Sequence, residues 1–293
     1  MAASAAGARA PRIDSHQHFW RYRPETHGWI DERMGVLKRD FLPPDLEPLL
    51  VAEGFSGSVA VQASQSLDET CFLLELAESH AFVHAVVGWV DLRAADLSRQ
   101  LENFTGRERL RGVRHIAQDE ADDAWLARED VIRGVGMLGR FGLVYDILVY
   151  PRQLESAIAL ARALPNQPFV LDHLAKPEIA KGRLDPWRAD LRRLAELPNV
   201  ACKLSGLVTE ARWDGWTATD FRPYLDVALD AFGPDRLMFG SDWPVCLLAG
   251  SYTEVVGLAR GAIAALSHDE QDAVLGGNAA RVYGIEPQAG GTA

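Results

Sequence analysis

The chain of 293 residues contains little cysteine. Its three cysteines, Cys71, Cys202 and Cys246, are widely spaced, and no CxxC pair occurs. An odd number of scattered thiols supports neither a disulfide framework nor a cysteine zinc site. We therefore expect reduced, structural thiols in a cytoplasmic protein. Cys246 attracts attention only because it follows a candidate site.

Long apolar runs and an excess of positive charge are also absent. No stretch approaches the roughly 18 apolar residues of a membrane span, and the alanine-rich start has no apolar core of signal-peptide length. Lysine and arginine number 30 against 41 aspartate and glutamate residues, which gives a formal net charge of −11. Such a field repels nucleic acids and anionic membranes, so we expect a small-molecule partner that is neutral or cationic. The sequence leaves open whether the chain forms a homo-oligomer.

The chain contains enough apolar residues for a sizeable core. Hydrophobic residues make up 48% and charged residues 24%, which is ordinary for a globular protein. No linker or low-complexity segment interrupts the chain. We expect one domain over residues 12–285, with residues 1–11 as a disordered leader and 286–293 as a mobile tail.

Short β-rich runs alternate with stretches of helical spacing along the whole chain. Alternation of this kind predicts parallel strands joined by crossover helices, and eight units match an α/β fold of the (β/α)8 TIM barrel type. A doubly wound sheet is the alternative, but no glycine-rich phosphate loop follows the first strand. The predicted strands span residues 12–19, 57–64, 83–92, 110–117, 142–149, 168–174, 200–206 and 236–243.

Two helices have clear start signals, and one connection is unusually long. A helix is predicted over 185–197, with Asp185 as N-cap and Pro186 at the first helical position. Another begins with the capping box SHDE at residues 267–270. The connection over residues 20–45 is rich in aromatic residues and proline, and we expect it to form an ordered lid.

Polar residues at the predicted strand ends define a candidate site, because catalytic groups of such barrels lie at the C-terminal ends of the strands. The first strand ends in His16 and His18, which alternation places on one face together with Asp14. The sixth strand ends in His173 and the eighth in Asp242. We expect both N-terminal histidines, His173 and Asp242 to converge at one mouth as imidazole and carboxylate ligands for zinc or a similar ion.

The combination of these motifs resembles a known family. The chain resembles the amidohydrolase superfamily in the order of its motifs, which are HxH, a later strand-end histidine and GSDWP. The segments that carry the resemblance are DSHQHFW, GVRHIAQDE, DHLAKP, CKLSGLVTEA and RLMFGSDWPV. More narrowly, the segments resemble the sugar-lactone hydrolases of its amidohydrolase-2 branch, of the fuconolactonase and rhamnonolactonase type. The resemblance covers residues 12–285.

The resemblance implies roles for particular residues. His16 and His18 would be first-strand metal ligands, His173 the sixth-strand histidine and Asp242 the eighth-strand carboxylate. Strand four offers no lysine or glutamate ligand, and strand five has Asp146 where a histidine is common, so one divalent ion is implied rather than two. Because some relatives in this branch act without a metal, metal-independent activity remains an alternative.

Lactone hydrolysis requires an activated water, a polarised carbonyl and a protonated leaving oxygen. We expect Asp242 to be the base and His173 to bind or polarise the substrate. Arg114 and His115 end the fourth strand, and alternation points one of them inward to contact the carbonyl or protonate the leaving oxygen. Structural alternatives are an orienting or capping carboxylate for Asp242, a core role for His173 and an outer-layer ion pair for Arg114.

Other strand-end residues complete the set of candidates. Trp20, Trp89 and Trp243 could stack on a sugar face, with a core position as the alternative for each. Lys203 and Asp146 are expected to form a buried ion pair across strands five and seven.

The hypothesis that best fits these residues is a hydrolase that opens a neutral sugar lactone to the aldonic acid. A decarboxylase or an aromatic or pyrone-type lactonase of the same branch would need several basic residues at the mouth, where Arg114 is the only clear one. A non-catalytic sugar-binding barrel would not require three histidines and a carboxylate to converge.

Overall fold

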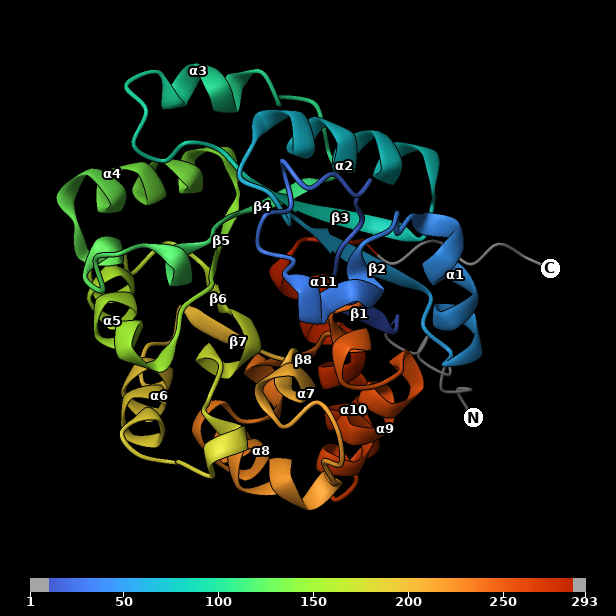
Figure 1. Ribbon diagram of the computed structural model, residues 1–293. Helices are drawn as coiled ribbons and strands as arrows, with labels where there is room; N and C mark the ends of the chain where they lie inside the picture. The colour runs from blue at the N-terminus through green and yellow to red at the C-terminus, as the bar shows by residue number, and fades with distance from the viewer. Residues whose placement is uncertain (1–10, 287–293) are drawn as a thin grey trace, which may run out of the picture.

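Eight parallel strands follow one another around a barrel, and helices surround it on the outside (Figure 1). The computed structural model describes residues 11–286. Backbone hydrogen bonds join the ends of the last and first strands, from Asp242 N to His16 O (2.8 Å) and from His18 N to Trp243 O (2.7 Å). The predicted (β/α)8 barrel is therefore confirmed.

Each predicted strand contains an observed strand that is shorter than the predicted range. The residues that follow each strand belong to loops at the mouth of the barrel. The predicted leader and tail, apart from Pro11 and Glu286, lie outside the described residues. The strands are β1 (Ile13–Gln17), β2 (Gly57–Val61), β3 (Val83–Gly88), β4 (Leu110–His115), β5 (Val144–Ile147), β6 (Phe169–Leu171), β7 (Val200–Leu204) and β8 (Leu237–Phe239).

The helices cover the outer face of the barrel, where apolar side chains of helices and strands form the main core. None of the described helices is long and apolar enough to cross a bilayer. The helices are α1 (Pro43–Ala52), α2 (Leu67–Ser79), α3 (Leu97–Glu102), α4 (Glu129–Leu138), α5 (Leu154–Ala163), α6 (Trp187–Ala195), α7 (Leu207–Glu210), α8 (Ala218–Phe232), α9 (Tyr252–Ile263), α10 (His268–Asp272) and α11 (Asn278–Val282).

A second, smaller apolar cluster fills the inside of the barrel. Side chains from the strands pack there against Ala279 of α11 and against Tyr283, which follows that helix. The turn before α11 passes so close to the start of β1 that a Cβ on Gly276 would lie 2.0 Å from Pro11 O. The segment that contains α11 thus lies beside the beginning of β1 and packs against the inner cluster. The inward side chains are Ile13, Val59, Val61, Ala85, Val87, Val144, Val170, Ala201 and Met238.

An irregularity in β1 corrects one expectation from the sequence. The pairing of β1 with β2 shifts register between Asp14 and Gln17. Such a bulge adds a residue to one strand and interrupts its alternation of faces. Ile13 therefore belongs to the inner cluster and His16 also faces inward, whereas the Asp14 carboxylate accepts hydrogen bonds from Ser241 N (2.8 Å) and from Tyr252 Oη in α9 (3.2 Å). The prediction that Asp14 shares the face of His16 was wrong.

The two predicted helix starts have different outcomes. Helix α6 begins at Trp187, and Asp185 makes an ion pair with Arg188 instead of capping the helix. The prediction of Asp185 as N-cap was therefore wrong. The capping box at α10 is confirmed, because Ser267 Oγ accepts from Glu270 N and the Glu270 carboxylate accepts from Ser267 N.

The long connection after β1 is ordered, as predicted. Trp20 and Phe41 exchange two backbone hydrogen bonds of 3.0 Å, which tie its ends together. Between them the chain forms the short 3-10 helix Glu32–Leu37. This segment carries Trp29 to the mouth of the barrel.

Candidate active site

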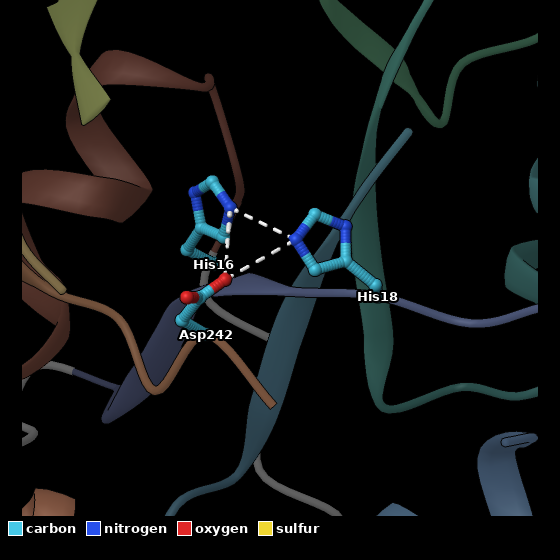
Figure 2. A group of neighbouring side chains, drawn as sticks. All are labelled: His16, His18 and Asp242. Atoms are coloured by element: carbon cyan, nitrogen blue, oxygen red, sulfur yellow. Dashed lines mark hydrogen bonds and ion pairs between the residues drawn. The ribbon is translucent and has the colours of Figure 1, made fainter. Parts of the chain in front are cut away.

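Three imidazoles and one carboxylate meet inside the mouth of the barrel. Figure 2 shows His16 and His18 directed toward one oxygen of Asp242 and toward each other. The Nε2 atoms of the two histidines are 3.2 Å apart, and they lie 3.8 Å and 3.3 Å from Asp242 Oδ1. His173 Nε2 lies 4.0 Å from the same oxygen. The predicted convergence of the four side chains is therefore found, and all four are buried.

Hydrogen bonds on the far side of two rings determine which nitrogen faces the cluster. His18 Nδ1 lies 2.7 Å from Val61 O, and because a carbonyl can only accept, Nδ1 holds the hydrogen in the neutral ring. Its Nε2 atom then presents a lone pair. His173 Nδ1 makes a hydrogen bond of 2.9 Å with Ser205 Oγ, a hydroxyl that is able to donate or to accept. Burial lowers the pKa of His173 to about 4 and that of His16 well below its usual value.

Asp242 is the anionic member of the cluster. Burial alone would raise the pKa of its carboxyl, but the nearby imidazoles of His173 and His18 outweigh burial and hold the pKa well below its usual range. Its backbone has a φ of 57°, a left-handed conformation that aspartate tolerates better than most residues. Asp242 O accepts a hydrogen bond from Cys246 N at 2.9 Å, which fixes the loop after β8.

A buried network of charges lies behind His16. Lys203 Nζ is 2.5 Å from Asp146 Oδ2, 3.0 Å from Asp172 Oδ1 and 3.2 Å from His16 Nδ1. All of these side chains are fully buried. Tyr283 Oη donates to Asp146 from below, at 2.8 Å and 3.0 Å from its two oxygens. The predicted ion pair of Lys203 and Asp146 is confirmed, and it forms part of a larger set.

Arg114 is the inward-facing residue at the end of β4. Its Nη1 atom donates to Asp172 Oδ2 at 2.9 Å, and its Nε and Nη2 atoms donate to Gln62. Arg114 also lines the pocket above the cluster. The donors of Arg114 are therefore directed at protein acceptors. Its ion pair lies inside the barrel and not in the outer layer, where the structural alternative placed it.

His115 points to the other side of β4. Its ring stacks on Trp125 with the centroids 4.1 Å apart. Its Nε2 atom lies 2.7 Å from Glu120 Oε1, and Trp89 Nε1 donates to its Nδ1 atom at 3.3 Å. The structure does not bring His115 together with the other candidate catalytic residues, because alternation along β4 gives the inward position to Arg114.

The three tryptophans chosen from the sequence do not line the pocket. Trp20 is buried against Phe41 and donates from Nε1 to Arg39 O at 2.9 Å. Trp243 is buried against Phe41 as well. Trp89 is held by His115. The positions of Trp20 and Trp243 match the structural alternative of core packing, whereas Trp89 is half-buried. The expectation that the three contact the sugar stays a prediction.

The pocket above the cluster has an empty volume of about 570 Å³, its open mouth included. Sequence reasoning did not identify several of its lining residues as functional. Trp29 comes from the lid, and its Nε1 atom is buried without a hydrogen-bond partner in the described structure. Lys176 follows His173 by three residues, and this short separation in the sequence was the signal that could have indicated its place in the pocket. The lining residues are His18, Trp29, Ala63, Arg114, Ile116, Gln118, Asp119, Leu148, His173, Lys176, Thr209, Asp242 and Val245.

The donor set fits a single metal ion. Ligand atoms around a tetrahedral zinc ion lie about 3.4 Å apart, from bonds of about 2.0–2.1 Å. The separations of 3.2, 3.3 and 3.8 Å among His16, His18 and Asp242 are close to that value. Within residues 11–286, Asp172 Oδ1 has no hydrogen-bond partner apart from its ion pair with Lys203, and it lies 3.3 Å from His16 Nδ1. If His16 Nδ1 donates its hydrogen to Asp172 Oδ1, the lone pair of His16 Nε2 is free to bind a metal.

The alternative combination of ligands does not form a separate site. In the described residues, two groups of three side chains have ligand atoms within 4.8 Å of one another. One contains His16, His18 and Asp242, and the other contains His16 with Asp172 and His173. Both include His16, which indicates one centre rather than two.

These observations define a class of hydrolase. Its members are barrels with HxH on the first strand, a histidine after the sixth strand and an aspartate after the eighth. A sequence profile of the family described as "Amidohydrolase" matches residues 13–285, and the chain belongs to this family. Among individual proteins, it is 53% identical over 287 residues to an L-fucono-1,5-lactonase of Burkholderia multivorans, covering 94% of this chain and 97% of that one.

Two further comparisons extend the likeness. An L-fucono-1,5-lactonase of Burkholderia ambifaria is 38% identical over 283 residues, which cover 95% of this chain and 97% of that protein. A crystal structure of an amidohydrolase from Burkholderia multivorans with bound zinc has a TM-score of 0.91 and 52% identity, covering 94% of this chain and 100% of that one. These proteins match nearly the whole length of the barrel.

Proposed function

We propose that the chain is a lactonase that opens a neutral sugar lactone of the L-fucono-1,5-lactone type to the aldonic acid. The observation that carries this proposal is the convergence of three histidine Nε2 atoms on Asp242 Oδ1 in the mouth of the barrel. The identity of 53% with an L-fucono-1,5-lactonase, over almost its full length, supports the choice of substrate.

One divalent ion would be held by His16, His18 and Asp242, with His173 beside them. Zinc suits this set of imidazoles and one carboxylate, and a similar amidohydrolase binds zinc in its crystal structure. A bound divalent ion supplies Lewis-acid chemistry that favours attack of water on an ester carbonyl.

Asp242 performs the proton transfers in this proposal. Its carboxylate is ionised at neutral pH, so it can accept a proton from the attacking water. The water oxygen bonds to the lactone carbonyl carbon, and the bond from that carbon to the ring oxygen then breaks. The proton passes to the ring oxygen, which becomes a hydroxyl group, and the carboxylic acid formed releases its proton to solvent as the carboxylate. His173 stands beside Asp242 with its Nε2 atom toward the reacting groups.

The charges of the pocket support a neutral substrate. The donors of Arg114 are directed to Gln62 and Asp172, so they do not form a free anion site. Lys176 is the other lysine or arginine among the lining residues. An aromatic dicarboxylate or a benzoate would call for several free cations at the mouth, which disfavours a pyrone-type lactonase or a decarboxylase. Trp29 provides an aromatic wall in place of the three tryptophans expected from the sequence.

The remaining expectations concern the setting of the enzyme. The three cysteines are free, at positions 71, 202 and 246, and two of them are buried. Reduced thiols support a cytoplasmic enzyme. The net charge of −11 supports a small-molecule partner rather than nucleic acid or a membrane surface.

A lactone panel tests the proposal. The purified protein is incubated with sugar 1,5- and 1,4-lactones in weak buffer that contains an indicator dye, and acid release is followed after spontaneous hydrolysis is subtracted. Six-carbon sugar 1,5-lactones are expected to be hydrolysed fastest. Absence of turnover on every sugar lactone, together with carbon dioxide release from an aromatic acid, would favour the decarboxylase alternative.

A further inference from the structure

The segment after β6 adopts an unusual backbone conformation. Four consecutive residues that are not glycine, from His173 to Lys176, have φ values of 54°, 52°, 58° and 51°. In the left-handed region the Cβ atom of an L-residue crowds the following carbonyl oxygen, so such residues usually occur singly. A run of four is costly, and costly backbone conformations are retained mainly at functional sites.

Specific contacts hold this left-handed turn in place. Lys176 N donates to His173 O at 2.8 Å, and Trp187 Nε1 donates to Leu174 O at 2.6 Å. The neighbouring Gly206 leaves room for the first ring, because a Cβ there would lie 2.4 Å from His173 Nδ1. These contacts support the left-handed conformation of the turn.

The effect of the turn is to direct two side chains into one pocket. His173 and Lys176 both line the pocket above Asp242. Lysine gives no advantage to the backbone at a φ of 51°, where glycine or asparagine would be less strained. The side chain of Lys176, rather than its main chain, accounts for the residue at this position.

The ammonium group of Lys176 has free donors. Its side chain is 18% exposed, and the nearest carboxylate oxygen, Glu210 Oε1, lies 3.9 Å from Nζ. That distance is too long for a hydrogen bond. The ring of Tyr150 has its centroid 5.5 Å from Nζ and attracts the cation without using an N–H donor. In the part of the chain that the structure describes, Nζ makes no direct hydrogen bond, in contrast to Arg114.

We propose that Lys176 is a specificity-determining residue, whose ammonium donates hydrogen bonds to ring hydroxyl groups of the sugar lactone. The inference rests on the proposed lactonase function and adds the part of the substrate that the enzyme recognises. A separation of 3.9 Å between Nζ and Glu210 Oε1 allows one hydroxyl oxygen to lie within hydrogen-bond distance of both. An ammonium donor beside a carboxylate acceptor suits a hydroxyl, which both donates and accepts.

The test compares two lactones that share the same ring ester. L-fucono-1,5-lactone has hydroxyl groups, whereas δ-valerolactone has none. Lys176→Met keeps the length of the side chain and removes its donors. We expect kcat/KM for the sugar lactone to fall about 10- to 100-fold in the variant, while kcat/KM for δ-valerolactone changes less than about threefold. Lys181→Met, at an exposed lysine in the same connection, is the matched control and should match the wild type on both substrates.

Each other outcome has a definite meaning. An equal fall on both lactones would overturn the proposal, because Lys176 would then act on the ester that they share. An unchanged kcat/KM for the sugar lactone would also overturn it while leaving lactonase function intact, and a wild type inactive on the sugar lactone would contradict the proposed function instead. If δ-valerolactone is too poor a substrate, the sugar lactone alone decides: a raised KM supports the hydroxyl contact, and a lowered kcat at constant KM refutes it.

A third variant connects the backbone to the function. Lys176→Gly relieves the left-handed strain and removes the ammonium, so its melting temperature should rise by about 1–2 °C while its kcat/KM for the sugar lactone falls as in Lys176→Met. A lower melting temperature together with normal kcat/KM would show that the position serves the fold and not the substrate.

Discussion

Lys203 Nζ lies 3.2 Å from His16 Nδ1, so a buried cation contacts the ring whose other nitrogen faces Asp242. The lysine also makes ion pairs with two buried carboxylates, Asp146 and Asp172. Removing one partner of such a set leaves an uncompensated charge in the interior. The stability of the barrel and the orientation of a candidate metal ligand therefore depend on one side chain.

Replacement of this lysine should destabilise the protein severely. Lys203→Met is expected to lower the free energy of unfolding by about 3–5 kcal/mol. The double variant Lys203→Met/Asp146→Asn, which also removes one carboxylate charge, should recover part of the loss. Unfolding in urea, followed by fluorescence and circular dichroism, measures both. A single variant as stable as the wild type would contradict the description of this network as a set of ionised partners.

Asp242→Asn should abolish turnover without unfolding the protein. Loss of general-base assistance typically lowers the rate by about 10²–10⁴-fold. Asparagine tolerates the left-handed backbone at this position, so the melting temperature should stay within a few degrees of the wild type. Specific activity and thermal melting are measured on the same preparation. Near-normal turnover in a stable variant would remove Asp242 from the proton transfers.

The variant His115→Ala tests whether His115, rather than its neighbour Arg114, takes part in catalysis. Because the ring stacks on Trp125 away from the pocket, its loss should cost about 1–3 kcal/mol of stability and change kcat/KM less than about threefold per folded molecule. Steady-state kinetics on the sugar lactone and chemical denaturation provide the two readings. A fall of 100-fold or more in kcat would return His115 to the catalytic set.

Removal of metal should affect both activity and stability. One equivalent of zinc per chain is expected by elemental analysis, because both candidate ligand groups share His16. Chelation should abolish activity, and zinc at about 100 times its dissociation constant should add about 2.7 kcal/mol to the stability of the apoprotein. Two equivalents of metal would refute the single centre, and full activity after chelation would assign the histidines to hydrogen bonding with the substrate.

Glu69 predicts a pH dependence of stability. Burial raises the pKa of its carboxyl from 4.5 to about 7, although Ser64 N donates to it at 2.6 Å. Between pH 4.5 and about 7 the folded protein binds a proton that the unfolded chain has lost, so stability contributed by this group falls as pH rises through that window. Glu69→Gln lacks the titration, and its stability relative to the wild type should increase by about 3 kcal/mol between pH 4.5 and 8. A constant difference across this range would contradict the raised pKa.

The sequence predicted the features that depend on periodic pattern. Eight apolar runs located the eight strands, and the positions of His16, His18, His173 and Asp242 at strand ends located the site, because the ends of parallel strands meet at one mouth. Alternation also limited β4 to one inward residue, which the structure identifies as Arg114.

Features that depend on local irregularity or on the path of a loop were not predictable in this way. The bulge in β1 places Asp14 and His16 on opposite faces of the strand, and no residue type in that strand predicts the bulge. Trp29 reaches the pocket because the lid folds back on itself, whereas Trp20, closer to the strand in sequence, turns into the core. The free ammonium of Lys176 depends on four left-handed residues that contain no glycine.

The hydrogen bonds between Tyr283 and Asp146 have a consequence for how the protein is made. Synthesis proceeds from the N-terminus, so His16 leaves the ribosome among the first residues of the barrel and Tyr283 among the last. Until Tyr283 emerges, Asp146 lacks a hydroxyl donor and the inner apolar cluster lacks one of its aromatic rings. The charge network behind His16 is thus completed only after Tyr283 has been synthesised, and a ribosome-bound chain that stops short of α11 would hold the candidate catalytic side chains above an incomplete inner cluster.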